Sequence, residues 1–563
     1  MTGRQRAAWT VSVVIGACTL AAFATFWFDS DRFSRLPRPG AAWLPVVLFV
    51  LLSLVVWHRI VMDALNHVLS RRLPVLEAPR EPEAGHRVAF LTTFVPGSEP
   101  VAMLRNTLQA MVAADYPHDT WVLDEGDDDD VRRICSELGV KHFSRRGVAD
   151  WNQADGPFAA RTKGGNHNAW YAAHGDDYDI VAQVDTDFVV RPDFLTRTLP
   201  EFHDSDVAWV VTPQIYGNTD SFVARAAGEQ QFTFYGSVLR GLSARRMALM
   251  LGANHVVRVA ALRREGWYEG HLTEDMATGI KLHAAGWRST YVAEPLAVGE
   301  GPTTWLAYVN QQMRWSFGCF DILRRVTWRR LPHLDWRARL YYVWLQQNYF
   351  SGLTFVVGAA LLVFYFLTGV AAAAIDLVPL LTWYAPYLVW RNVHNWAMTR
   401  FNVRPDVERG VMLAGRVVGV FVQPVYFLAL LGVLRGKHLS FKVTPKGGKD
   451  RSSNSLAVFR PQVGLAVVMS AAVAVGVALG HTAGVLLAWA AVIVVGMLLV
   501  PALHVLPGFG SALVGRVRTL REGTVATPSV ISLPQDPRAG VLPSGLPVPR
   551  TAEALMEPTP DMV

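Results

Sequence analysis

The chain has 563 residues, of which 51% are hydrophobic and 18% are charged, and its formal net charge is +7. This balance is too apolar for an ordinary soluble protein and indicates membrane spans. Because lysine and arginine favour the cytoplasmic side of membrane proteins, the positive charge is explained without a nucleic-acid partner, and we predict none. The three cysteines, Cys18, Cys135 and Cys319, have no paired spacing, which excludes a disulfide framework and a cysteine-based metal site.

Two apolar runs lie near the N-terminus, at residues 8–28 and 41–57, and each has about the length of one membrane span. The first run is followed by a second span, and no small-residue cleavage site precedes a soluble domain. We therefore interpret it as an anchor and not as a signal peptide. Residues 1–84 are predicted to form two N-terminal transmembrane helices.

Residues 85–305 alternate between strand-like and helix-like segments. Runs such as "RVAFLTTFV" and "DIVAQVDTD" are typical of buried strands, and "VAMLRNTLQAMVAAD" has helical spacing. This alternation predicts a mostly parallel sheet with helices on both faces. Ligands of such sheets bind at the carboxyl ends of the strands, where Asp124 ends one strand and Asp185 with Asp187 ends another.

Asp185 and Asp187 are separated by one residue, so their carboxylates can share a divalent cation. Oxygen ligands completed by phosphates suit Mg²⁺ and Mn²⁺. An ordinary solvated turn is the alternative interpretation. Most of "DEGDDDD" (124–130) is interpreted as a solvated helix N-terminus, where acidic residues suit the helix dipole, and only Asp124 in it is a strong candidate.

Two further motifs precede helix-like segments. "RTKGGNHNAW" (161–170) places Lys163 and two glycines where a lysine and backbone amides can bind a phosphate, although a basic loop is the simpler alternative. "HLTED" places Thr273, Glu274 and Asp275 at a helix start. There the alternative is plain capping, with Thr273 or Asp275 binding free amides.

The segment "VNQQMRWSFG" contains Gln311, Arg314 and Trp315 in the pattern Q-x-x-R-W, next to apolar sequence. Arginine and tryptophan both favour the membrane interface, so an interfacial anchor is the alternative interpretation. The tail from residue 517 is rich in Pro, Gly, Ser and Thr and has too few apolar residues to pack, which predicts disorder.

In this order and spacing, D, D-x-D, T-E-D and Q-x-x-R-W resemble the motifs of the processive membrane glycosyltransferases of family 2, the cellulose synthase-like group. Downstream, "FKVTPKGG" (441–448) looks like the F-x-V-T-x-K-G gating loop of bacterial cellulose synthases. The resemblance implies an α/β nucleotide-sugar-binding domain of the GT-A, Rossmann-like type. This domain would lie in the cytosol, inserted in an α-helical transmembrane bundle.

The resemblance also implies roles for single residues. Asp275 would be the general base that takes the proton of the acceptor hydroxyl. The donor would be bound by Asp124, Lys163, Asp185 and Arg314, the acceptor by Gln311, Trp315 and Glu274, and Mg²⁺ or Mn²⁺ by Asp185 and Asp187. The gating loop would consist of Phe441, Val443, Thr444 and Lys446.

The implied activity is the inverting, metal-dependent and processive transfer of a sugar, with UDP-glucose as the expected donor, to a growing β-linked polysaccharide that passes across the membrane. The implied partners are a nucleotide-sugar donor, a polysaccharide acceptor and the lipid bilayer of the plasma membrane, while an envelope export partner is left unidentified. Non-processive transfer of one sugar to a lipid carrier is one alternative. A catalytically silent binding or transport protein is another, and the intact carboxylates at every motif argue against it.

The chain departs from the family pattern in three places. Glu125 stands where the family often has a second aspartate, and "TTFVPGSEP" (92–100) lacks the tyrosine that usually meets the nucleobase, so Phe94 or Glu99 is expected to replace it. No segment after residue 503 is patterned like a PilZ domain, so we expect no activation by cyclic-di-GMP.

The predicted membrane topology follows from placing residues 85–305 and the gating loop on the cytoplasmic side of the membrane. Pro424 and basic flanking sequence indicate that the apolar run at 412–434 does not cross the membrane. Three arginines in the first external loop, Arg32, Arg35 and Arg38, disagree with the charge rule. The predicted topology has six spans. Interfacial helices at 306–350 are followed by a transmembrane hairpin at 351–395 and by an interfacial or re-entrant segment with the gating loop at 396–450. A second hairpin at 460–503 and a disordered tail at 504–563 complete the chain.

Overall fold

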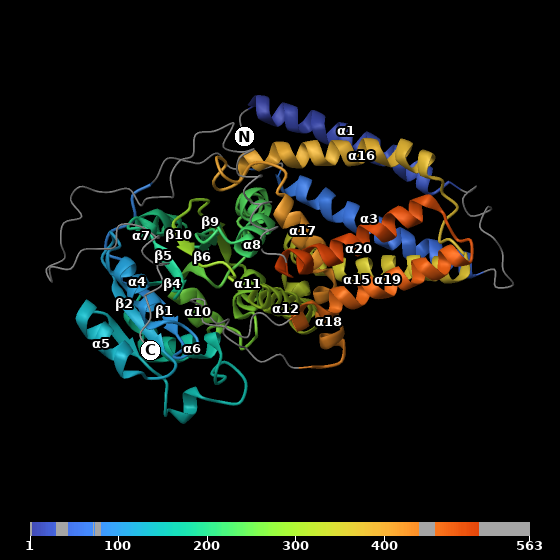
Figure 1. Cartoon of the computed structure of the whole chain (residues 1–563). Helices are drawn as coiled ribbons and strands as arrows, with labels where there is room; N and C mark the ends of the chain where they lie inside the picture. The colour runs from blue at the N-terminus through green and yellow to red at the C-terminus, as the bar shows by residue number, and fades with distance from the viewer. Residues whose placement is uncertain (1–2, 30–42, 71–72, 74–79, 438–455, 506–563) are drawn as a thin grey trace.

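The computed structural model describes residues 3–29, 43–70, 73, 80–437 and 456–505. A mixed α/β domain occupies one side of the molecule and long apolar helices occupy the other (Figure 1). The chain enters the α/β domain after the first two long helices and leaves it through α12 (Trp305–Ile322). The α/β domain is therefore inserted between membrane-type helices, as the sequence predicts.

The main sheet has seven strands in the order β3-β2-β1-β4-β8-β6-β9. β1, β2, β3 and β4 are mutually parallel where they pair, β6 and β9 are parallel, and β8 runs antiparallel to both β4 and β6. The strands are β1 (Val88–Phe94), β2 (Asp119–Asp124), β3 (Lys141–Phe143), β4 (Ile180–Asp185), β6 (Val207–Val211), β8 (Asn254–Arg258) and β9 (Arg288–Tyr291). The prediction of a mostly parallel sheet is confirmed, with β8 as the exception.

Both faces of this sheet are covered, because successive side chains of a strand point to opposite faces. In β1, Ala89 and Leu91 belong to one hydrophobic core, whereas Val88 and Phe90 belong to the other. The helices that cover the sheet are α4 (Val101–Val112), α5 (Asp129–Leu138), α6 (Lys163–His174), α7 (Phe194–Thr198), α10 (Val259–Glu265) and α11 (Glu274–Ala284).

The last residues of the acidic run at 124–130, Asp128 to Asp130, cap and begin α5, whereas Asp124 ends β2 and the residues between them form a loop. The carboxylate of Asp128 accepts hydrogen bonds from the amides of Asp130 at 2.8 Å and Val131 at 3.4 Å. The helix ends at Gly139, whose φ of 68° lies in the left-handed region that glycine adopts without strain.

A second sheet consists of three short strands. Its order is β5 (Phe188–Val190), β10 (Ala297–Gly299) and β7 (Ile215–Tyr216), with β5 antiparallel and β7 parallel to β10. α8 (Phe222–Thr233) packs against β7, α9 (Leu239–Ser243) packs against β9 of the main sheet, and α12 contacts β7 through Gln311 and Tyr216. α12 leads through α13 (Trp328–Arg330) and α14 (Trp336–Gln347) to the membrane-type helices.

Five helices among the described residues are long and apolar enough to cross a membrane. They are Gly3–Trp27 (α1), Leu44–Ser70 (α3), Trp336–Thr368 (α14 with α15, Ser351–Thr368), Leu456–Ala478 (which contains α19, Arg460–Ala478) and Gly484–Val505 (α20). The neighbouring pair α17 (Leu413–Phe421) and α18 (Gln423–Leu434) is bent by 41° and has the geometry of a broken span or a re-entrant loop. The break falls at Val422, two residues before Pro424, in the run that the sequence predicts to be interrupted.

The helix α16 (Leu377–Met398), which contains most of the second half of the hairpin predicted at 351–395, is not among these five. It contains Arg391 and His394, which lower its hydropathy, and it lies alongside α1 (Figure 1). α15 packs instead against α3, α18 and α19, so the two helices of the predicted hairpin pack mainly against other helices. The crossing of the membrane by α16 remains a prediction. The predicted gating loop at 441–446 and the tail after residue 505 lie outside the described residues.

Candidate active site

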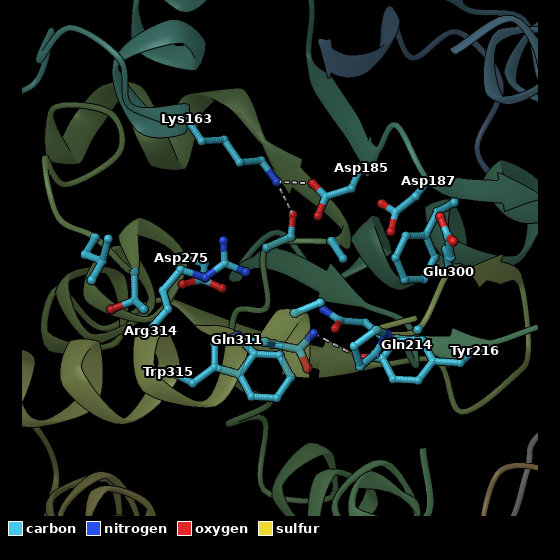
Figure 2. Close-up of a pocket in the computed structure, with 18 of the residues that line it drawn as sticks. Lys163, Asp185, Asp187, Gln214, Tyr216, Asp275, Glu300, Gln311, Arg314 and Trp315 are labelled. Carbon is cyan, nitrogen blue, oxygen red and sulfur yellow. Dashed lines mark hydrogen bonds and ion pairs between the residues drawn. The ribbon is translucent and has the colours of Figure 1, made fainter. Parts of the chain in front are cut away.

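A cavity of about 180 Å³ lies at the carboxyl end of β4, between the two sheets and α12 (Figure 2). Most of the predicted site residues line it together: Lys163, Asp185, Asp187, Glu274, Asp275, Gln311, Arg314 and Trp315. They come from the end of β4, from the starts of α6 and α11, and from α12. Motifs that are up to about 150 residues apart in the sequence therefore converge on one space.

Asp185 and Lys163 form an ion pair at one wall of this cavity. The ammonium of Lys163 also donates a hydrogen bond of 2.7 Å to the carbonyl of Gly252. Burial lowers the pKa of Lys163, but the carboxylates of Asp185 and Glu274 raise it more, so the net pKa lies above the ordinary value. Lys163 is thus a fixed cation at the cavity, and it lies in the first turn of α6 rather than before it.

Glu274, which is buried, and Asp275, which is half-buried, are adjacent carboxyl groups at the start of α11. Burial, reinforced by the charge of Asp275, raises the pKa of Glu274 to about 7. Burial also raises the pKa of Asp275, although the amides of Met276 and Gly252 stabilise its charged form. The Met276 amide donates to Asp275 at 2.7 Å, and a Cβ on Gly252 would come within 3.1 Å of the same carboxylate.

A carboxyl group with a raised pKa in a cavity is suited to take a proton near neutral pH. The capping alternative for this motif does not account for Thr273, whose side chain makes no capping hydrogen bond to α11.

The motif on α12 presents one face to the cavity, because residues three and four apart lie on the same side of a helix. Gln311 donates a hydrogen bond of 3.3 Å to the hydroxyl of Tyr216. Arg314 and Trp315 follow on the same face and line the cavity (Figure 2). On the other side of α12, Gln312 accepts a hydrogen bond of 2.7 Å from Tyr426 of α18. Arg314 and Trp315 therefore face the acidic residues, which the interfacial-anchor alternative does not require.

A clasp holds the T-E-D loop against α12. His271 contacts Asp321 of α12 at 2.9 Å through Nε2, while its Nδ1 accepts from the amide of Thr273 at 3.1 Å. Arg325 contacts the other oxygen of Asp321 at 2.7 Å. A Cβ on Gly318 would come within 2.5 Å of Thr273, so only glycine allows this approach. The sequence patterns do not identify this clasp.

Asp124 is at the predicted strand end but not in the cavity, which differs from its predicted place among the donor-binding residues. Its carboxylate is fully buried and accepts hydrogen bonds from the amides of Gly126 at 2.9 Å and Asp128 at 2.6 Å. His142 contacts it at 3.2 Å. In this structure Asp124 orders the loop that follows β2, and its role in donor binding remains a prediction.

Phe94 and Glu99, the two residues expected to replace the missing tyrosine, lie in different environments. Phe94 is fully buried in the core beneath the sheet, so the expectation that it contacts the nucleobase is wrong. Glu99 accepts hydrogen bonds from the amide of Val95 and the hydroxyl of Thr186, both at 3.2 Å. It thereby ties the loop after β1 to the D-x-D segment.

Several cavity residues were not predicted from the sequence. Gln214, Tyr216 and Glu300 line the cavity from segments that adjoin or form the short strands β7 and β10 (Figure 2). These strands are two and three residues long, too short to show a periodic pattern. The sequence therefore does not mark these residues as strand ends, the feature that identified Asp185 and Asp187.

Asp187 and Asp185 line the same cavity, and their predicted binding of a divalent cation that is shared with the donor remains a prediction. In the part of the chain that the structure describes, no three His, Cys, Asp or Glu side chains are placed to hold a metal ion by themselves. Mg²⁺ in phosphate sites commonly has one or two carboxylate ligands, and substrate phosphates and water complete its shell. The donor set of this cavity agrees with that kind of site.

Comparisons with known proteins agree with the geometry. Residues 180–392 match the family model described as glycosyl transferase family group 2. The UDP-forming cellulose synthase catalytic subunit of Pseudomonas fluorescens is 28% identical over 389 residues, which cover 67% of this chain and 50% of that protein. The UDP-forming cellulose synthase 1 catalytic subunit of Komagataeibacter xylinus is 24% identical over 453 residues, which cover 76% of this chain and 56% of that protein.

Among solved structures, a mannosyltransferase of Pyrobaculum calidifontis in complex with GDP-Man and Mn²⁺ is 15% identical, with a TM-score of 0.46. The match covers 70% of this chain and 100% of that one. The chain spans about half the length of the two cellulose synthase subunits that it matches. Residues 180–392 therefore match glycosyl transferase family group 2, and the chain as a whole is similar to the catalytic subunits of cellulose synthases.

Proposed function

We propose that the chain transfers a sugar from a nucleotide sugar, with UDP-glucose as the expected donor, to a growing β-linked polysaccharide. The observation that carries this proposal is the single cavity in which Asp275 lies together with Arg314 and Trp315 of α12. A proton acceptor, a cation for the leaving group and an aromatic platform for a sugar are thus within one reacting space.

In the proposed reaction, Asp275 takes the proton of the acceptor hydroxyl as that oxygen attacks the anomeric carbon of the donor sugar. One direct displacement inverts the anomeric centre, so an α-linked donor gives a β-linked product. The guanidinium of Arg314 and the ammonium of Lys163 bind the diphosphate that leaves. When bound, Mg²⁺ or Mn²⁺ supplies further neutralisation of charge on that diphosphate.

The acceptor side is assigned to the other face of the cavity. The indole of Trp315 stacks on the terminal sugar of the polymer, with Gln311 and Glu274 as hydrogen-bonding partners of its hydroxyl groups. Gln311 is oriented by Tyr216, which also accepts a hydrogen bond of 3.0 Å from Gln231. An ordered platform of this kind holds the chain end after each addition, which processive synthesis requires.

We place the protein in the plasma membrane with its catalytic domain in the cytoplasm, where nucleotide sugars are available. Processive synthesis is preferred to transfer of one sugar to a lipid carrier because α18 packs directly on α12, the helix that carries Trp315. Membrane-type helices therefore begin next to the acceptor position.

The test uses membrane vesicles that contain the full chain and a panel of radiolabelled nucleotide sugars. The products are separated by size and by solvent extraction. Label in a long polymer, with UDP-glucose as the best donor, is the expected result. Label confined to the solvent-extracted lipid fraction would contradict processive synthesis, and no incorporation from any donor would contradict the transferase reaction itself.

A further inference from the structure

Glu300 is a cavity carboxylate that directly follows β10 and lines the same space as Asp187 (Figure 2). β10 and β5 are antiparallel, with Gly299 opposite Phe188. Continuing that register by one position puts Glu300 opposite Asp187. The small sheet thus brings together two carboxylates that are 113 positions apart in the sequence.

The backbone around Glu300 is fixed on both sides. The amide of Gly301 donates to the side-chain oxygen of Asn218 at 2.8 Å, and the Asn218 nitrogen donates to the carbonyl of Gly301 at 2.9 Å. The amide of Gly217 donates to the carbonyl of Gly299 at 2.9 Å. Asn218 is itself buried. The position of Glu300 is therefore set by the fold, as a residue that binds a ligand at a defined distance requires.

Asp185, the other aspartate of D-x-D, has a different neighbour. Its carboxylate forms an ion pair with Lys163, whose ammonium is also anchored on the carbonyl of Gly252 at 2.7 Å. A dication on Asp185 would lie next to this ammonium and be repelled by it. Like charges directly opposite in a strand pair destabilise a sheet, and a bound cation reverses the sign of that interaction at Asp187 and Glu300.

We propose that Asp187 and Glu300 are the two protein ligands of the divalent cation, and that Asp185 instead positions Lys163 for the donor diphosphate. The proposal rests on the proposed function, because the cation is the one shared with the nucleotide sugar. Two carboxylates leave the remaining positions of an octahedral shell to phosphate and water, which suits Mg²⁺ and Mn²⁺. They also need no third protein ligand from the described residues.

The experiment measures Mn²⁺ binding to the purified full chain in detergent, in the presence of UDP, with unbound Mn²⁺ determined by electron paramagnetic resonance. The variants are Glu300→Gln, Asp187→Asn and Asp185→Asn. The matched control is Glu137→Gln, a partly exposed glutamate that pairs with Arg105 on the surface. Thermal unfolding of each variant verifies that the fold is retained.

Loss of even an outer-shell partner costs roughly 10- to 100-fold in metal affinity, so Glu300→Gln and Asp187→Asn are expected to weaken Mn²⁺ binding by at least roughly tenfold. Asp185→Asn and Glu137→Gln are expected to bind Mn²⁺ nearly as the unaltered chain does. If Asp185→Asn loses as much affinity as Glu300→Gln, or if Glu300→Gln binds normally, the proposal is overturned.

Two further outcomes are distinguishable from these. If Glu300→Gln loses its fold, Glu300→Asp takes its place, and unchanged Mn²⁺ binding by that variant contradicts the proposal while weaker binding supports it. If the unaltered chain binds no Mn²⁺ with UDP present, the metal dependence within the proposed function fails, whatever the variants do.

Discussion

At the scale of single residues, the chemistry of the cavity depends on two neighbouring carboxyl groups with unlike surroundings. Asp275 accepts a hydrogen bond from the amide of Met276, and the positive charge of Lys163 favours the charged form of Asp275. Burial and the negative charge of Asp275 disfavour the charged form of Glu274 and raise its pKa. Asp275, whose carboxylate is held by the Met276 amide, is the group that we propose as the base.

Asp275→Asn is expected to keep UDP affinity and to lose nearly all sugar transfer, because an amide takes up no proton. Loss of a general base costs roughly 10²- to 10⁴-fold in rate. The measurements are initial rates of polymer elongation and UDP binding by calorimetry. Elongation by the variant at near the normal rate would show that Asp275 is not the base.

The pH dependence of transfer follows from the same pair. A raised pKa means that the pair retains a proton at pH values where an ordinary carboxyl group is charged, and a base acts only when it is deprotonated. Activity is therefore expected to be lost as pH falls through the pKa of Asp275, which burial raises above that of an ordinary carboxyl group. Rate against pH around neutrality measures this acid limb.

Glu274→Gln removes a negative charge next to Asp275, so a proton on Asp275 becomes less favourable. The acid limb of the variant is expected to move to lower pH, even where acceptor binding is weaker and the absolute rate is lower. The same rate profile, normalised to its maximum, is the measurement. An unchanged midpoint would show that the acid limb does not arise from the titration of this pair.

At the scale of elements, the active geometry depends on how closely α11 and α12 approach. Gly318 lets α12 meet the loop at Thr273, and the pair of His271 and Asp321 fixes that contact. Asp275 at the start of α11 and Trp315 on α12 are thereby held in a fixed relative position. The clasp makes two separate motifs into one site.

Gly318→Ala is expected to push Thr273 aside and to reduce the transfer rate by roughly tenfold or more, since small misplacements of reacting groups are costly. UDP affinity is expected to change little, because Gly318 does not line the cavity. The matched control is Gly464→Ala in α19, where an added Cβ meets nothing within 4 Å. Equal rates in the two variants would contradict a positioning role for this contact.

Elements also explain what the sequence predicts and what it does not. The D-x-D pair was predictable because β4 is a six-residue apolar run whose end is unambiguous. The place of Asp124 was not, because its hydrogen bonds depend on a loop in which Asp127 has a φ of 57°. Glu300 depends on the register between two three-residue strands, which no local pattern specifies.

At the scale of the whole molecule, packing shows which helix ends share a side. His481, between α19 and α20, contacts the carbonyl of Phe366 in the last turns of α15 at 2.8 Å. Asn402, which follows the C-terminal end of α16, lies against Gly236 of the catalytic domain. A Cβ added to Gly236 would come within 2.4 Å of the Asn402 side chain. α16 therefore connects the end of the bundle that is distant from the catalytic domain with the end next to it, although its hydropathy does not mark it as a span.

The six-span topology is tested by cysteine labelling in intact cells. Cys135 and Cys319 are buried, so replacing Cys18 by alanine gives a suitable background. Single cysteines at Asp376 and Thr482 are expected to react with a membrane-impermeant maleimide added outside, and a cysteine at Asp406 only after permeabilisation. Labelling at position 406 from outside would show that α16 does not cross the membrane.

The contacts of α16 have a consequence for the order of biogenesis. Arg391 meets Asp63 of α3 at 2.5 Å, and the indole of Trp390 donates to the carbonyl of Ser12 in α1 at 2.6 Å, where Gly16 leaves room for it. A lone arginine in hydrocarbon costs at least ~2.5 kcal/mol, so α16 is a poor substrate for insertion by itself. In the six-span topology, we therefore expect the N-terminal pair, synthesised more than 300 residues earlier, to remain near the translocon until α16 is made. The first two helices would then act as an intramolecular chaperone for a helix that the ribosome makes long after them.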